Sequence, residues 1–275
     1  MTKNIISAGA MALSLSMIPM TAAFADKAED MAKKLANPIA AMISLPIQYN
    51  YDSDIGKFDT GDRSKVNVQP VIPISMNDDW NLITRTIIPV IWQSDISYDP
   101  VTGKSSGSQS GLGSTSMSLW VSPKALTSNG WVWGAGPVFL LPTTTNDRLG
   151  GDQWGIGPTG IALKQTGPWT YGGLANHIWS FAEDDNAKIS NTFIQPFLTY
   201  VTPDAWTYAL NTESNYNWET ESWAVPINFM VSKLVQVGTQ LISVQGGVRY
   251  WAVTDDDNSP EGWGARFALT FIFPK

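Results

Sequence analysis

Residues 240–253 read QLISVQGGVRYWAV, and the character of the side chain changes at each step. One set of alternate residues is apolar or small, and the other set is mostly polar: Ile242, Val244, Gly246, Val248 and Tyr250 against Ser243, Gln245, Gly247, Arg249 and Trp251. Successive side chains of a β-strand point to opposite faces of the sheet. The stretch is therefore predicted to be a strand with one apolar and one polar face.

The same period of two recurs from residue 43 almost to the end of the chain. It predicts twelve strands, at residues 43–51, 64–76, 80–95, 114–124, 131–143, 153–165, 169–181, 191–202, 206–218, 222–236, 240–253 and 263–273. The connections alternate between short turns and longer polar loops. An even number of strands with short turns at one end and long loops at the other is typical of outer-membrane barrels. We therefore expect an all-β fold, a transmembrane antiparallel β-barrel of about twelve strands, with one short N-terminal helix.

Tryptophan directly follows four of the five short turns, at Trp80, Trp131, Trp169 and Trp206. Tryptophan is amphipathic and prefers the boundary between membrane and water. A ring of tryptophans at one end of the strands is thus predicted to be an aromatic girdle. The alternative is four separate core residues in a soluble β-protein, which would not be expected beside the short turns.

The beginning of the chain has the pattern of a secretory signal. Lys3 precedes a mostly apolar stretch over residues 5–18, and Ala23-Phe24-Ala25 has the small-x-small form of a cleavage site. The expected organisation is a signal peptide over residues 1–25, a short periplasmic helical segment over residues 26–38, and an outer-membrane barrel over residues 39–275. No apolar stretch of about 18 residues follows residue 25, so no transmembrane helix is expected. The expected location is the bacterial outer membrane.

The composition excludes several classes of function. A net charge of −7 argues against a nucleic-acid partner, because phosphate binding needs a basic surface. The absence of cysteine removes disulfides and thiol catalysis. The Gly-x-Gly pairs do not open a helix after a strand, so they do not predict a phosphate-binding loop. We expect no cofactor.

Several prolines lie inside the predicted strands, among them the seven at positions 70, 73, 89, 137, 158, 196 and 226. Proline cannot donate a hydrogen bond to a neighbouring strand, and a closed barrel has no free edge for it. The prolines therefore predict bulges or bent strands, or errors in the strand assignment.

His177 is the single histidine of the chain and the first candidate for enzyme chemistry. Asn176-His177 resembles the Asn/His/Ser hydrolytic triad of outer-membrane phospholipase A, in which histidine and serine lie two residues apart on one strand. Here the nearest downstream serine is Ser180, three residues on, and this odd spacing puts the two side chains on opposite faces. The sequence favours an ordinary strand histidine and a protein that is not an enzyme.

Acidic stretches offer few metal ligands. Residues 52–56, DSDIG, begin like a calcium loop, but the later ligands of an EF-hand are missing, so a polar loop is expected. Residues 183–185 and 255–257 are acidic runs in long loops. They are interpreted as solvated, with divalent-cation bridges to lipopolysaccharide as the alternative. No metal site is predicted.

The chain has five arginines, and the alternation turns Arg85, Arg249 and Arg266 toward the barrel interior near mid-membrane. An arginine in a low-dielectric wall must face water, an acid or a solute. The predicted pore lining consists of eight residues: Arg85, Arg249, Arg266, Lys65, Glu213, Asn211, Gln245 and Gln69. We expect a constriction with a basic stripe that orients anionic or aromatic solutes. The alternative is an ion-pair network that plugs a narrow lumen.

Three segments carry a family resemblance: residues 35–40 (LANPIA), 43–51 (ISLPIQYNY) and 134–143 (GAGPVFLLPT). Together with the signal pattern they resemble the bacterial outer-membrane transporters grouped as the MetA-pathway of phenol degradation family. The resemblance implies a porin-like barrel associated with the breakdown of aromatic compounds. It implies no particular functional residue.

The expected function is passive passage of small solutes, including aromatic or hydrophobic compounds, through an outer-membrane channel. The expected partners are outer-membrane lipid, lipopolysaccharide and a small-molecule solute. Two alternatives remain: an outer-membrane lipid hydrolase, and a plugged barrel with a structural or adhesive role.

Overall fold

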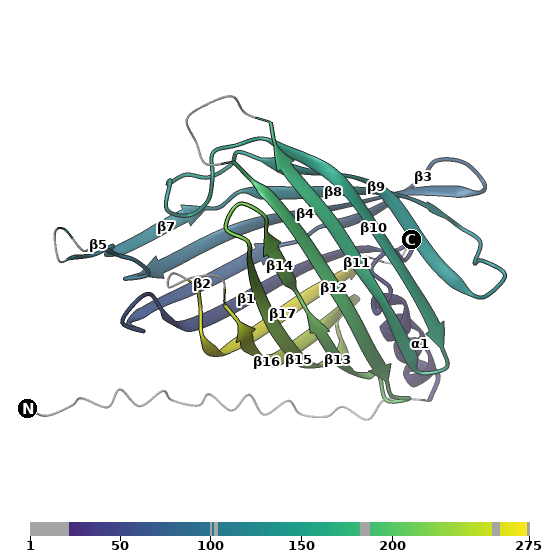
Figure 1. Cartoon of the computed structure of the whole chain (residues 1–275). Helices are drawn as coiled ribbons and strands as arrows, with labels where there is room; N and C mark the ends of the chain where they lie inside the picture. The colour runs from purple at the N-terminus through teal and green to yellow at the C-terminus, as the bar shows by residue number, and fades with distance from the viewer. Residues whose placement is uncertain (1–21, 100, 102–103, 182–187, 255–258, 274–275) are drawn as a thin grey trace, which may run out of the picture.

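A computed structural model describes residues 22–99, 101, 104–181, 188–254 and 259–273. The chain forms a closed antiparallel β-barrel of twelve strand positions with one short helix (Figure 1). The elements are α1 (Ala22–Leu35), β1 (Ile43–Ile55), β2 (Gly61–Val68), β3 (Val71–Ser75), β4 (Trp80–Ser94), β5 (Tyr98–Asp99), β6 (Lys104–Ser105), β7 (Ser108–Leu112), β8 (Thr115–Pro123), β9 (Trp131–Leu141), β10 (Gly155–Thr166), β11 (Trp169–Ser180), β12 (Ser190–Val201), β13 (Trp206–Thr212), β14 (Ser214–Asn217), β15 (Ser222–Val237), β16 (Gln240–Val253) and β17 (Gly262–Phe273).

Hydrogen-bonded neighbours follow the ring β11-β10-β9-β8-β4-β2-β1-β17-β16-β15-β13-β12, and the β12–β11 pair closes it. Three short strands continue three others: β3 continues β2, β7 continues β8, and β14 continues β13. The first and last strands of the barrel, β1 and β17, lie side by side from Ile43↔Phe273 to Asp52↔Gly264. Closure gives each of the twelve strand positions a partner on both sides, which a barrel in lipid requires.

The predicted strands correspond closely to the twelve positions, with three differences. β1 continues to Ile55, so residues 52–55 are strand and not the predicted polar loop. β2 likewise begins at Gly61, inside the same predicted loop. Two predicted strands, 64–76 and 206–218, each correspond to two shorter strands, and β7 lies in the predicted loop before residue 114.

The in-strand prolines interrupt hydrogen bonding but rarely shift the register. Between β10 and β11 the pairing stops at Pro158 and resumes unchanged, from Ile156↔Trp179 to Thr159↔Asn176. The pairing of β2 and β3 with β4 also keeps one register across Pro70, from Val68↔Ile88 to Val71↔Arg85. Of these seven prolines, Pro226 alone is accompanied by a shift of register in the described pairings. Neighbours on both sides hold each strand in place, so the strand assignment stands despite the missing bonds.

The outer face of the barrel is apolar. Nine side chains that alternation assigns to this face are exposed or partly exposed: Val66, Val68, Ile72, Ile74, Ile242, Val244, Val248, Leu269 and Phe271. The neighbours of Leu269 on its strand, Ala268 and Thr270, face the lumen. A continuous exposed apolar band around a closed barrel is a lipid-facing surface.

Each of the four predicted girdle tryptophans is the first residue of a strand at the short-turn end. Trp80 packs edge-on against Trp133 at 6.1 Å between ring centroids, and Trp131 packs against Tyr171 at 6.0 Å. Trp169 and Trp206 are 44% and 38% exposed. Their contact with the membrane boundary stays a prediction.

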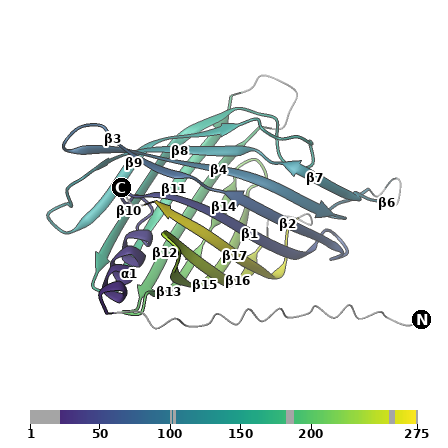
Figure 2. The same cartoon turned by 180° about the vertical axis from the view of Figure 1, so that it is seen from behind.

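Helix α1 lies inside the short-turn mouth of the barrel (Figures 1 and 2). Ala28 and Ala32 are buried against Val201, Leu234 and Ile272. From β10, Gln165 Nε2 donates a hydrogen bond to the carbonyl oxygen of Lys33 at 2.8 Å. The predicted helical segment over residues 26–38 thus overlaps α1, which packs in the lumen.

No helix among the described residues is long and apolar enough to cross a membrane. Residues 1–21 of the predicted signal peptide lie outside the described residues, and cleavage after Ala25 stays a prediction.

Candidate functional site

Two cavities occupy the lumen. The inner cavity, of about 270 Å³, lies beside α1, and the outer cavity, of about 450 Å³, lies toward the long loops. Both are lined by the same seven residues where they meet: Gln48, Gln69, Arg85, Leu174, Gln195, Glu213 and Arg266. We call this shared set the constriction.

The structure brings all eight predicted pore-lining residues to these cavities. Gln69, Arg85, Glu213 and Arg266 belong to the constriction. Lys65 and Arg249 line the outer cavity, and Asn211 and Gln245 line the inner cavity. The alternation of residues therefore placed these side chains on the lumen side, although their role in conduction stays a prediction.

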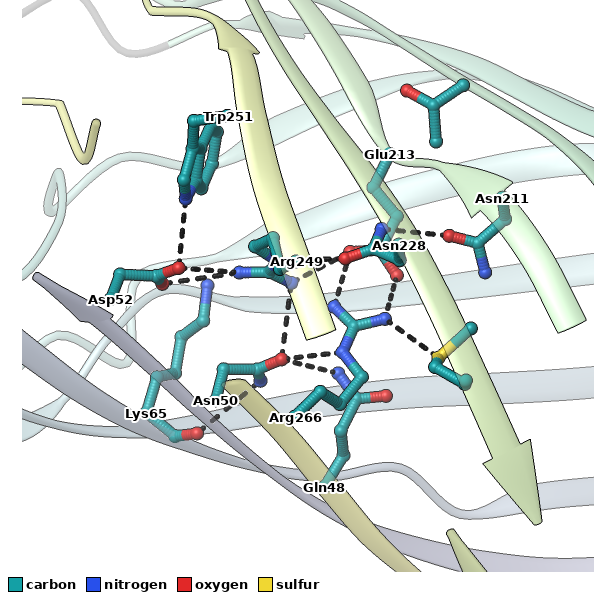
Figure 3. Close-up of polar contacts among 12 residues, drawn as sticks. Gln48, Asn50, Asp52, Lys65, Asn211, Glu213, Asn228, Arg249, Trp251 and Arg266 are labelled. Carbon is teal, nitrogen blue, oxygen red and sulfur yellow. Dashed lines mark hydrogen bonds and ion pairs between the residues drawn. The ribbon is translucent and has the colours of Figure 1, made fainter. Parts of the chain in front are cut away.

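Arg249 and Arg266 are held in one network of charged hydrogen bonds (Figure 3). Arg266 binds Glu213 through two parallel bonds, Nη1 to Oε1 at 2.8 Å and Nη2 to Oε2 at 2.7 Å. Arg249 Nη1 binds Asp52 Oδ2 at 3.2 Å, and its Nη2 binds Glu213 Oε2 at 3.2 Å. Asn50 Oδ1 accepts a bond from each arginine, at 2.7 Å from Arg266 and 3.2 Å from Arg249. Such charge-assisted, two-pronged pairs offset the cost of removing the ions from bulk water.

Glycines make room for this network. Across β17, the register places Gly264 between Asp52 and Arg249. A Cβ at position 264 would lie 2.7 Å from Asp52 Oδ1, where the carboxylate meets Arg249. Gly247 similarly stands beside Arg266 in the register. The small residues of the lumen face therefore allow long side chains to reach across a strand.

Four residues of the network escaped the sequence-based prediction: Asn50, Asp52, Asn228 and Trp251. Asn228 Oδ1 accepts a bond from Arg249 Nε at 2.9 Å, and Trp251 Nε1 donates to Asp52 Oδ1 at 2.9 Å. The prediction that residues 52–56 form a polar loop is wrong at Asp52, whose carboxylate is buried and ion-paired. Alternation along residues 44–52 puts Asn50 and Asp52 on the polar face, and this signal could have identified both.

Arg85 and Lys65 differ from the two networked arginines. Arg85 Nη2 donates to Gln69 Oε1 at 2.8 Å. Within the described part of the chain, neither Arg85 nor Lys65 has a carboxylate oxygen within 4.0 Å. Figure 3 shows the Lys65 side chain rising from β2 beside the Asp52–Arg249 pair. These two cations carry charge that direct ion pairs do not neutralise.

His177 faces the outside of the barrel, whereas Asn176 lines the outer cavity. The ring packs against Trp179 at 4.1 Å between centroids. His177 Nδ1 meets Thr192 Oγ1 at 2.7 Å, and Nε2 lies 3.5 Å from Ser190 Oγ. A hydrolytic histidine needs a group that orients the ring and a closely bonded nucleophile. With Asn176 on the other side of the wall, the Asn/His/Ser arrangement is not assembled.

Two acidic segments are predicted to be solvated loops. Residues 183–185 and 255–257 lie outside the described residues. Divalent-cation bridging there stays a hypothesis.

The closed barrel with an apolar exterior and a polar lumen is an outer-membrane β-barrel, and it is located in the bacterial outer membrane. Comparison with solved structures gives the same fold. The COG4313 outer membrane channel from Pseudomonas putida F1 is similar over 85% of this chain and 96% of that chain, with a TM-score of 0.65 and 14% identity.

Two further solved structures are more distant. A NanC porin matches 83% of this chain and 98% of its own, with a TM-score of 0.49 and 9% identity. The outer membrane phospholipase A from Escherichia coli matches 91% and 98%, with a TM-score of 0.47 and 11% identity. No protein-family model and no curated protein matches the chain. At these identities the likeness shows the fold alone.

Proposed function

We propose that this protein is a passive channel for small solutes across the outer membrane and is not an enzyme. The observation that carries the proposal is the pair of lumen cavities that meet at a constriction of two arginines, one glutamate, three glutamines and one leucine. Polar and charged groups around a narrow lumen select solutes by size and charge. The COG4313 channel supports the choice of a channel over other barrel functions because its fold is the most similar of the three compared above.

We infer that the channel prefers anions. Four cations, Lys65, Arg85, Arg249 and Arg266, stand against the carboxylates of Asp52 and Glu213 in the network and at the cavity walls. A positive excess in a low-dielectric passage attracts anions and repels cations. Phe193 and Trp251 also line the outer cavity, which supports aromatic or hydrophobic compounds as solutes. Membership of the MetA-pathway of phenol degradation family is part of this proposal.

A plugged barrel is the second candidate, because α1 lies in the inner mouth and Arg249 and Arg266 are ion-paired. A conductance measurement distinguishes the channel from the plugged barrel. The refolded full-length protein, reconstituted in planar bilayers, should conduct ions and show an anion-selective reversal potential in a salt gradient. A protein that folds, judged by heat-modifiable gel mobility, and never conducts would contradict the channel.

Charge removal tests the basis of selectivity. Arg85→Gln should shift the reversal potential toward cations without lowering stability, since Arg85 has no carboxylate partner in the described network. Arg249→Gln should also destabilise the fold, because it leaves Asp52 with a broken ion pair. Lys164→Gln is the matched control. Its register partners are Trp131 and Tyr171 on the outer face, so selectivity should not change.

A further inference from the structure

The outer cavity has two chemically different walls. The basic wall comes from β2, β17 and β16, which carry Lys65, Arg266 and Arg249. The other wall comes from β9, β11 and β12, and five of its side chains toward this cavity are apolar: Val138, Leu140, Leu174, Ile178 and Phe193. The same wall also carries the amide side chains of Asn176, Asn191 and Gln195.

The ring order places these walls opposite each other. Six positions separate β2 from β12, and six separate β1 from β11, which is half of the twelve-position ring. Lys65 on β2 therefore stands across the lumen from Phe193 on β12. On β10, between the two halves of the apolar wall, Gly155 and Gly157 bring no side chain to the lumen. A solute in this cavity meets charge on one side and apolar surface on the other.

The apolar wall is part of a larger apolar surface. Phe193 packs against a buried cluster that includes Leu174, Ile161 and Trp120. This backing holds the wall in position, as a binding surface requires. Lys65, like the ion-paired Arg249, is a cation of the opposite wall that lines the outer cavity and not the inner one. Its ammonium group lacks a carboxylate within ion-pair distance among the described residues.

We propose that the outer cavity is a binding site for amphipathic carboxylates, with Lys65 binding the carboxylate and the Phe193 wall packing against the apolar tail. This inference rests on the proposed channel function and names its class of solute. A charged ammonium in a partly desolvated wall is stabilised by an anion. A volume of about 450 Å³ falls within the range of about 300–1,000 Å³ found for small-molecule pockets.

The test compares three probes as blockers of chloride current through the reconstituted full-length protein: hexanoate, acetate and 1-hexanol. Hexanoate has both a carboxylate and a tail, and each of the others lacks one of them. Each buried methylene contributes about 0.8 kcal/mol, so partial burial of four should lower the half-blocking concentration about tenfold or more relative to acetate. Hexanol should not block at the hexanoate concentration. Equal block by hexanoate and acetate, or by hexanoate and hexanol, would overturn the proposal.

Variants test each wall separately. Lys65→Gln should raise the half-blocking concentration of hexanoate about tenfold, because a charged hydrogen bond is lost. Phe193→Ala should raise the half-blocking concentration of hexanoate close to that of acetate. The half-blocking concentration of acetate should not change. The matched controls lie on the outer face: Lys164→Gln for charge, and Phe267→Ala for the ring, which is 58% exposed. If Phe193→Ala fails to fold, Ile178→Ala tests the same wall.

The channel and the binding site can fail separately. Absence of current from the folded protein would contradict the channel function. Calorimetric titration of hexanoate into the detergent-folded protein then tests whether the outer cavity still binds it. Binding that is lost in Lys65→Gln supports the site, and no binding overturns it. Current without a preference for hexanoate overturns the site and leaves the channel.

Discussion

Arg266 and Glu213 lie on β17 and just before β14, and they form a two-pronged ion pair with distances of 2.7 and 2.8 Å. The same carboxylate also accepts a bond from Arg249 at 3.2 Å. Glu213 is thus shared by two arginines, and the positions of both depend on it.

Glu213→Gln should therefore lower the free energy of unfolding by about 1–3 kcal/mol, because two guanidinium groups lose their charged acceptor. It should also strengthen anion preference, since one negative charge leaves the constriction. Urea-dependent refolding into vesicles measures the loss of stability. Reversal potentials in a salt gradient measure the change in anion preference. Glu219→Gln, at an exposed position, is the control and should change neither.

Leu269→Arg tests the assignment of the outer face. Leu269 is 45% exposed and lies between lumen-facing residues of β17. An arginine near the middle of the lipid-facing surface should cost about 2–4 kcal/mol of folding stability. Refolding in bilayers measures this cost, and an unchanged stability would mean that Leu269 does not contact lipid.

Gly157→Ala tests the close approach of β10 and β11 beside Pro158. A Cβ at position 157 would lie 1.6 Å from the carbonyl oxygen of His177, so the strands must separate. The expected loss is about 1–3 kcal/mol or more, as for other overpacked sites. Gly160→Ala on the same strand is the control. Its nearest neighbour would be 3.9 Å away, and stability should hardly change.

Helix α1 is predicted to restrict the inner mouth. Ala32 is 4% exposed against lumen residues, so Ala32→Glu should displace the helix by burying an unpaired carboxylate. Single-channel conductance should then rise. Lys34→Glu puts the same side chain on an exposed position of the helix and should leave conductance nearly unchanged. Equal conductance in both variants would show that α1 does not limit the current.

His177 is predicted to have no catalytic role. Refolded wild-type protein and His177→Ala should release fatty acid from phospholipid vesicles only at the background rate, with or without calcium. Release that disappears in both His177→Ala and Ser190→Ala would contradict this prediction and support a hydrolase, because Ser190 is the serine nearest the ring in the described network.

Most of the barrel could be predicted from local patterns. In an extended chain, alternation decides which face a side chain takes, and this is a property of neighbouring residues. That is why residues such as Arg85, Lys65 and Leu269 could be assigned to lumen or lipid before any pairing was known. Turn length and the tryptophans after the turns similarly depend on a few adjacent positions.

Which side chains contact each other, in contrast, depends on how the strands close into a ring. Arg249 meets Asp52 because β1 and β17 pair at the point of closure and Gly264 leaves space between them, which joins residues 197 positions apart. The location of α1 in the inner mouth and the opposition of Lys65 to Phe193 also depend on the order of strands around the ring. Period-two alternation specifies inside or outside but carries no information about height and angle around a barrel. The sequence by itself therefore determined the two faces of the wall, and the tertiary structure decided which side chains meet across the lumen.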